Sequence, residues 1–102
     1  MKKLTIEVIE ISGICPVYKV GDRLVIDDGY KLNLKETTNV CMHSLTSILP
    51  YYIALSKDVN PVELGLSRKD KPGPDSKKAY IQCLDPCKYT GGGTVVFEIS
   101  II

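Results

Sequence analysis

The amino-acid sequence predicts an α+β protein, in which an antiparallel sheet of about five strands packs against one Pro-kinked helix. Three observations support this fold class. Apolar and polar residues alternate near both ends of the chain, an Asp-Gly pair marks a hairpin in the first third, and the middle holds one long segment of helical period. A chain of 102 residues, 44% of them hydrophobic, is expected to form a single domain over 1–102 with its own core.

The first half of the chain predicts three strands. Leu4–Ile9 alternates apolar and polar residues, which is the period of a half-buried strand. Arg23–Asp27 gives a second strand that ends at Asp28-Gly29, a pair that favours a tight turn with positive φ. Tyr30–Leu34 is then the return strand of a hairpin.

The middle of the chain predicts two helices. Asn39 is the expected N-cap of the long helix, which places Cys41 in its first turn, and Pro50 is expected to kink or split it. A short second helix is predicted to begin at Asn60 and to end at Gly65. The predicted apolar stripe of the long helix consists of Leu45, Ile48, Leu49, Tyr52 and Leu55 or Ser56.

The last third predicts a loop and two further strands. The stretch 67–78 is rich in basic residues around Pro72-Gly73-Pro74, and we expect a solvated loop, with a binding role as the alternative. Strands are predicted over Ala79–Cys83 and Thr94–Ile101. The segment Gly91-Gly92-Gly93 precedes a strand and not a helix, which argues against a dinucleotide or phosphate loop. These glycines are expected either to form a flexible turn or to allow a close backbone approach.

The overall charge excludes several classes of partner. Thirteen basic and twelve acidic residues give a formal net charge of +1, so the sequence predicts neither nucleic-acid nor anionic-membrane binding. No apolar stretch approaches the roughly 20 residues that span a bilayer, and the N-terminus lacks the apolar region of a signal peptide. We therefore expect a cytoplasmic protein, with its oligomeric state left open.

The four cysteines are the candidate functional residues. Cys15 follows the first strand, Cys41 opens the long helix, and Cys83 and Cys87 bracket a turn at Asp85-Pro86 after a late strand. The sequence holds no Cys-x-x-Cys pair, which argues against zinc ribbons and ferredoxin-type clusters but not against a site that the fold assembles. The predicted ligands of a metal ion or iron–sulfur cluster are Cys15, Cys41, Cys83 and Cys87.

Two other uses of the cysteines stay open. Free cysteine is among the most buried residue types, so all four side chains are also compatible with simple packing and no cofactor. Thiol–disulfide chemistry through Cys83 and Cys87 is a third interpretation.

Among the cysteines, Cys41 is the strongest candidate for a thiolate, because a helix N-terminus lowers the pKa of a thiol. His43 lies two residues beyond it, and on a helix such positions point about 200° apart, which argues against one metal ion binding both. Asp22 and Asp85 are expected to form turns or to accept hydrogen bonds beside the site.

Several short motifs in order resemble those of a family of small uncharacterised prokaryotic proteins of about this length, common in anaerobic bacteria and archaea. They are Cys15-Pro16, Gly21-Asp22, Cys41, Leu49-Pro50-Tyr51, Ala54-Leu55, Cys83-x-Asp85 and Val95-Val96-Phe97-Glu98-Ile99, with Tyr89–Thr94 similar to one subgroup. The resemblance covers nearly the whole chain. It implies that Cys15, Cys41 and Cys83 are the shared cysteines and that Cys87 stands outside the pattern, so that three thiolates and an exchangeable position fit better than four. The family brings no established activity.

The sequence thus favours a binding protein over an enzyme, because it holds no identifiable pair of nucleophile and base. The predicted function is a metal- or iron–sulfur-binding protein with a convergent cysteine site, which holds zinc or an iron–sulfur cluster. The alternative is a protein-interaction or accessory module that presents an edge strand or the 67–78 loop to a partner protein and binds no cofactor.

Overall fold

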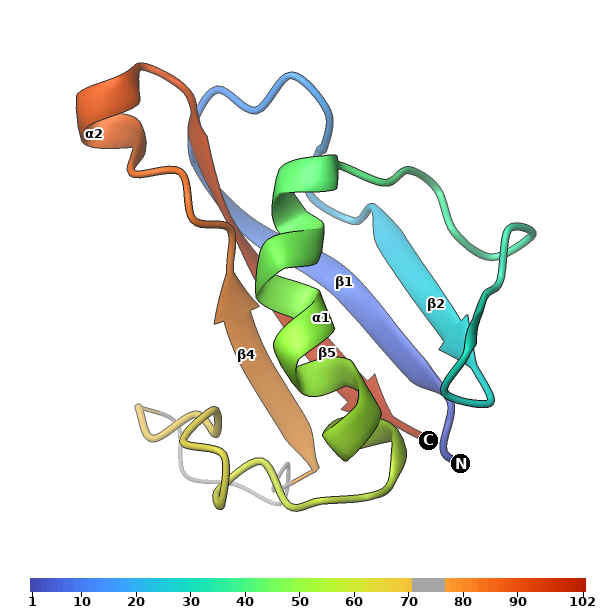
Figure 1. Cartoon of the computed structure of the whole chain (residues 1–102). Coiled ribbons are helices and arrows are strands. Elements are labelled where there is room, and N and C mark those ends of the chain that lie inside the picture. The colour runs from blue at the N-terminus through green and yellow to red at the C-terminus, as the bar shows by residue number, and fades with distance from the viewer. Residues whose placement is uncertain (71–76) are drawn as a thin grey trace.

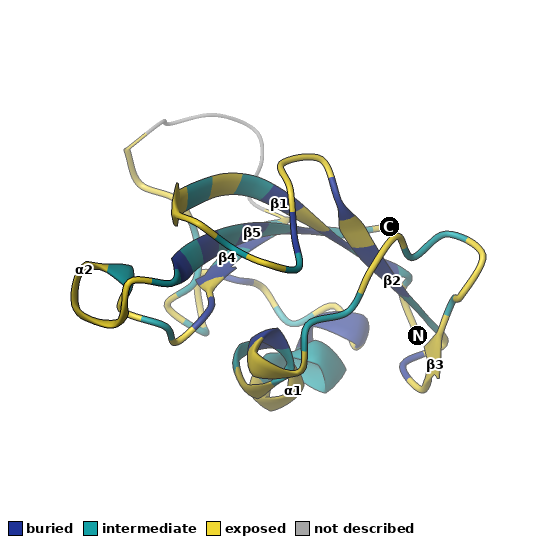
Figure 2. Ribbon diagram, turned by 90° about the horizontal axis from the view of Figure 1, so that it is seen from above, coloured by how far each residue is buried: buried dark blue, intermediate teal, exposed yellow. Residues whose placement is uncertain are grey.

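The described part of the chain forms a five-stranded antiparallel sheet in the order β3-β2-β1-β5-β4. Figure 1 shows β2, β1, β5 and β4 side by side, and Figure 2 labels β3 at the edge beyond β2. The computed structural model describes residues 1–70 and 77–102. The strands are β1 (Leu4–Gly13), β2 (Arg23–Asp27), β3 (Lys31–Leu32), β4 (Lys78–Gln82) and β5 (Gly93–Ile101), and the helices are α1 (Met42–Ser56) and α2 (Cys87–Thr90). Figure 2 shows α1 lying along one face of the sheet. The predicted α+β class is therefore confirmed.

The core forms between α1 and the two central strands. Alternate residues of β1 and β5 are buried because successive side chains of a strand point to opposite faces. The pairs Ile6↔Ile99 and Val8↔Phe97 stand directly opposite each other, and a bulge shifts the register between Val8 and Glu10. The buried apolar residues include Leu4, Ile6, Val8, Leu24, Ile48, Leu55, Val95, Phe97 and Ile99. This packing fixes the positions of the strand ends that form the candidate site.

The predicted hairpin is confirmed, with a shorter return strand. Asp28 and Gly29 adopt φ of 53° and 68°, the conformation that a tight primed turn requires. The return strand β3 spans two residues instead of Tyr30–Leu34. Beyond it, the hydroxyl groups of Thr37 and Thr38 accept hydrogen bonds from the β2 amides of Val25 and Arg23. Threonine side chains therefore cover the β2 edge where a longer strand was expected.

Helix α1 begins later than the sequence predicted. Its N-cap is Cys41 and not Asn39, whose side-chain amide instead donates to the Val17 carbonyl at 3.0 Å. The helix runs through Pro50 to Ser56, so the expected split does not occur. Leu49, predicted to lie in the apolar stripe, is 55% exposed, whereas Ile48 is buried.

The segment after α1 forms tight turns in place of the predicted second helix. The Asn60 side chain caps it as expected and accepts from the Val62 amide at 3.0 Å, and Gly65 adopts φ of 71°. The following amides bond to carbonyls three residues back, as in Gly65 to Val62. Pro72-Gly73-Pro74 of the predicted loop lies outside the described residues. Within the described ranges, no helix is long and apolar enough to cross a membrane.

Candidate functional site

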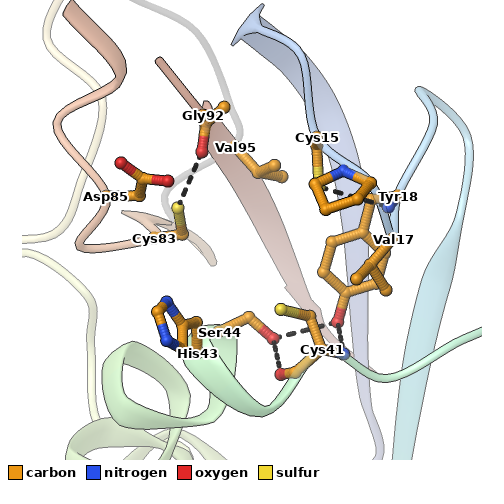
Figure 3. A pocket seen from close by; sticks show the side chains of 12 residues that line it. Cys15, Val17, Tyr18, Cys41, His43, Ser44, Cys83, Asp85, Gly92 and Val95 are labelled. Carbon is orange, nitrogen blue, oxygen red and sulfur yellow. Dashed lines mark hydrogen bonds between the residues drawn. The ribbon is translucent and has the colours of Figure 1, made fainter. Parts of the chain in front are cut away.

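A pocket of about 320 Å³ lies at the end of the sheet where β1 finishes and β5 begins (Figure 3). We call it the thiol pocket, because three cysteines line it. Its walls come from the segment after β1, from the start of α1 and from the connection between β4 and β5. The lining residues are Cys15, Pro16, Val17, Tyr18, Cys41, His43, Ser44, Cys83, Asp85, Gly92, Gly93 and Val95. The fold therefore brings together three of the four cysteines predicted as ligands.

Gly93 holds two of these cysteines in place. A side-chain Cβ at Gly93 would lie 2.6 Å from the Cys15 amide nitrogen and 2.8 Å from the Ile14 carbonyl carbon, so that only glycine fits against this backbone. The carbonyl of the same residue accepts a hydrogen bond from the Cys83 thiol at 3.4 Å. Cys83 is itself buried, with 7% of its surface exposed. Gly93 thus sets the positions of Cys15 and Cys83 together.

The other glycines of the triplet also have defined places. Gly91 ends α2 in the left-handed conformation, with φ of 76°. A Cβ at Gly92 would lie 2.3 Å from an Asp85 carboxylate oxygen, and the Gly92 carbonyl accepts from the Ile14 amide at 3.1 Å. The predicted close backbone approach is confirmed, and the neighbour is the protein's own chain.

The two aspartates singled out in the sequence form turns, as expected. Asp85 accepts hydrogen bonds from the Thr90 hydroxyl at its carboxylate and from the Thr94 hydroxyl at its carbonyl, and the Asp22 carboxylate accepts from the Lys19 amide.

Tyr18 ties the first two cysteines together, and the sequence analysis did not identify it. Its amide donates to the Cys15 sulfur at 3.3 Å, and its hydroxyl accepts from the Cys41 amide at 2.8 Å. The Ser44 hydroxyl donates to the Cys41 carbonyl at 2.7 Å. Because Ser44 has a single hydroxyl proton, the 2.9 Å contact between the two hydroxyls has Tyr18 as donor. These bonds close a ring from the Cys41 amide back to its carbonyl, drawn as dashed lines in Figure 3.

Burial keeps this ring intact. Tyr18 is 5% exposed and meets Phe97 edge to face, with 5.6 Å between ring centroids. Burial raises the pKa of Tyr18 above its ordinary value of 10.0. The phenol therefore stays protonated at neutral pH and keeps donating to Ser44.

His43 and Cys41 both line the thiol pocket, and the premise of the argument from helical spacing is wrong. That argument placed both residues inside the helix. Cys41 instead precedes the helix with an extended backbone, φ −93° and ψ 128°, so the angle of about 200° between positions i and i+2 of a helix does not apply. The imidazole forms no hydrogen bond with the residues that the structure describes. His43 is thus a second donor that the helix start directs to the pocket.

Cys87 lies apart from the thiol pocket. It starts α2, where its Cβ is 3.1 Å from the place that a Gly13 side chain would occupy, and its amide donates to the Thr94 hydroxyl at 3.2 Å. All four cysteines are free thiols. In the described parts of the chain, no three His, Cys, Asp or Glu side chains converge closely enough to hold a metal ion as they stand.

Comparisons with protein-family models, with curated proteins and with solved structures found no match to this chain.

Proposed function

We propose that the protein binds a thiophilic metal ion or an iron–sulfur cluster in the thiol pocket through Cys15, Cys41 and Cys83. The observation that supports this most is the convergence of three free thiols from three distant chain segments on one pocket. Thiolates are the ligands that select zinc, copper(I) and iron–sulfur clusters. A location in the cytoplasm, predicted from the sequence, would keep these thiols reduced.

The walls of the pocket suit such a ligand. Pro16, Val17 and Val95 give it an apolar lining. Apolar surroundings lower the local dielectric constant, which strengthens the attraction between a cation and thiolates. Three protein ligands are the number found where a metal keeps an exchangeable position.

Binding in this proposal requires the pocket to close. Its donors line the same cavity without surrounding one point, so rotation of the thiols and a small movement of the start of α1 toward Cys83 would complete the site. Metal binding that completes a site also stabilises the fold, because the unfolded chain offers no such arrangement. The protein is therefore expected to melt at a higher temperature with its metal than without it.

The test is metal analysis with an absorption spectrum on protein purified without air. We expect a stoichiometric metal: colourless zinc, or iron with the broad visible absorption of thiolate-ligated clusters. Cys41→Ser should lose the metal, and Cys87→Ser, outside the pocket, is the matched control that should keep it. A metal-free wild-type protein that also fails to bind added zinc or iron would overturn the proposal.

A second candidate function is a protein-interaction module, in which the cysteines only pack. This function is supported by a large, exposed apolar residue next in the sequence to each cysteine of the pocket. These residues are Ile14, Met42 and Leu84, which are 79%, 75% and 57% exposed. Exposed apolar residues around a cavity are typical of contact surfaces. This function predicts that Met42→Ser weakens association with a partner protein, whereas Cys41→Ser leaves it unchanged; the reverse pattern would favour the metal site.

A further inference from the structure

We infer that a second cavity, beside the thiol pocket, binds a small zwitterion of the α-amino acid class through Asp22 and Lys19. This cavity measures about 380 Å³, and we call it the aspartate pocket. It shares the segment 15–18 with the thiol pocket, and binding in it requires no metal ion. The residues that line it are Cys15, Pro16, Val17, Tyr18, Lys19, Asp22, Thr38 and Asn39.

Asp22 is a buried carboxylate whose charge has no ion pair. The residue is 7% exposed, and only one of its two carboxylate oxygens accepts a hydrogen bond, from the Lys19 amide to Oδ2 at 3.0 Å. Among the described residues, no charged nitrogen lies within 4.0 Å of either oxygen. Buried carboxylates are normally paired, because removing a charge from water is costly. Asp22 therefore lacks a partner that a ligand can supply.

The second oxygen of Asp22 is accessible from the cavity. In the described parts of the chain, Ser56 Oγ is the one side-chain oxygen that is both fully enclosed and without a hydrogen bond. Asp22 Oδ1 also has no hydrogen bond with the described residues, so it is not fully enclosed, and Asp22 lines the aspartate pocket. A carboxylate oxygen that faces a cavity is a strong acceptor for an ammonium group.

The backbone around Asp22 holds this acceptor in place. The Asp22 amide donates to the Lys19 carbonyl at 3.0 Å and closes a turn, in which Gly21 adopts the positive φ, 98°, typical of the third residue of a type II turn. This turn is fixed to β1, because the Val8 amide donates to the Asp22 carbonyl and the Val8 carbonyl accepts from the Gly21 amide. A preorganised acceptor lowers the entropy cost of binding a ligand.

Lys19 gives the same cavity a positive charge. Its side chain is exposed, and its ammonium group forms no ion pair with Asp22 or with another described residue. Two opposite charges therefore line one cavity without neutralising each other. An α-amino acid carries both complementary charges on one carbon atom, so its ammonium group can donate to Asp22 while its carboxylate pairs with Lys19.

The remaining walls suit the other parts of an amino acid. Pro16, Val17 and Tyr18 offer apolar surface to a side chain. Asn39 provides a further acceptor for the ammonium group, because its amide oxygen accepts one hydrogen bond, from the Val40 amide at 3.0 Å, and keeps a second lone pair. These groups together favour amino acids over simple amines and simple carboxylates.

The experiment is a titration of nitrogen-15 labelled protein with each of the standard amino acids in turn, at millimolar concentrations and with a chelator present. The backbone amides of Lys19, Asp22 and Asn39 report on the cavity. We expect saturable shifts of these amides with at least one amino acid. The methyl ester of that amino acid lacks the negative charge, and the matching carboxylic acid lacks the ammonium group. Both should bind at least about tenfold more weakly, since each loses a charged contact.

Two variants assign the charges. Asp22→Asn keeps an oxygen that accepts from the Lys19 amide but removes the charge, so it should fold and should bind the amino acid at least about tenfold more weakly. Lys19→Gln should weaken binding less, because its side chain is exposed to solvent. Asp28→Asn, in the exposed hairpin turn, is the matched control and should bind as wild type does.

The outcomes separate this site from the proposed metal function. If no amino acid gives a saturable shift, or if Asp22→Asn keeps the wild-type affinity, the inference is overturned. An ester that binds as tightly as its amino acid overturns the assignment to amino acids. Equal weakening by Asp28→Asn and Asp22→Asn also overturns it, because the effect is then one of net charge. Amino acid binding by metal-free protein supports the aspartate pocket even where the metal function fails.

Discussion

The two ends of the sheet differ in the chemistry that they carry. At one end, where β1 finishes and α1 begins, lie the thiol pocket and all four cysteines. At the other end lie both chain termini, the hairpin turn and surface ion pairs such as Lys3 with Glu36 and Lys31 with Asp28 (Figure 1). We call these the pocket end and the terminus end.

The difference shows how a small sheet divides its tasks. At the terminus end a tight turn at Asp28-Gly29 joins β2 to β3, and the chain also leaves α1 there, where the Lys2 amide donates to the Ser56 carbonyl. The pocket end uses long connections that bond to one another across the chain, as Tyr18 does with Cys41 and Gly92 with Ile14. Loops that are held by a rigid scaffold commonly carry function. At the pocket end, the connections that carry the cysteines hold one another in place through these bonds.

The largest effect that separates the two ends is expected for glycine replacement. Gly93→Ala would place a methyl group against the Cys15 backbone, and we expect a loss of about 3 kcal/mol in the free energy of unfolding. Gly65→Ala, in open space but with φ of 71°, is the control and should cost about 1 kcal/mol through conformation alone. Urea denaturation of reduced protein measures both. Equal losses of stability would mean that the backbone around Gly93 moves to accept the methyl group at no extra cost.

A smaller loss of stability is expected when the hydroxyl of the buried Tyr18 is removed. Tyr18→Phe keeps the contact with Phe97 but leaves the Cys41 amide without its acceptor, which should cost about 1–2 kcal/mol. Tyr30→Phe, in the hairpin and 78% exposed, should change nothing measurable. Thermal and urea unfolding of the two variants test this contrast. A neutral Tyr18→Phe would show that water replaces the ring without loss.

The raised pKa of Tyr18 predicts that the stability of the protein depends on pH. Since the pKa of Tyr18 is raised on folding, the folded state favours the neutral phenol. The stability linked to this preference is complete below the ordinary value of 10.0 and is lost as pH rises through the raised pKa. Unfolding curves between neutral and alkaline pH should therefore show a loss in wild type that Tyr18→Phe lacks. Parallel curves would contradict it.

The smallest effect is expected at the terminus end, for Glu36→Gln. Its hydrogen bond with the Lys3 ammonium lowers the pKa of Glu36 below 4.5, so the stability it adds is present above that pH and is lost as pH falls through the lowered pKa. Both side chains are well exposed, and salt should screen the effect. Acid unfolding at low and high salt measures it. An effect as large as that of Tyr18→Phe would mean that the terminus end depends on its charges.

Local patterns in the sequence were sufficient to predict the sheet, but they did not predict where the long helix begins or the short helix α2. The alternation in β1 and β5 and the turn at Asp28-Gly29 depend on neighbouring residues, so both were predictable. The start of α1 was misplaced because Asn39 bonds to Val17, a partner 22 residues away along the chain. The short helix α2 was missed, since four residues give no periodicity.

The candidate site was predictable in its cysteines and not in their surroundings. Cys15, Cys41 and Cys83 stand next to the ends of strands or of the long helix. Element ends meet at the two ends of a sheet, so the convergence of these cysteines could be predicted from the sequence. Cys87 follows the same rule along the chain but faces Gly13 instead. Nothing in the spacing indicated that Tyr18 joins Cys15 to Cys41, because that link requires the packing of Tyr18 on Phe97.

The pairing of β1 with β5 has a consequence for the timing of assembly. These are the first and last strands along the chain, yet they are neighbours in the sheet, and Gly93 at the start of β5 packs against Cys15 just after β1. During synthesis the pocket can therefore form only after Gly93 and β5 have emerged. A chain that stops before Gly93 would lack the residue that positions Cys15 and Cys83.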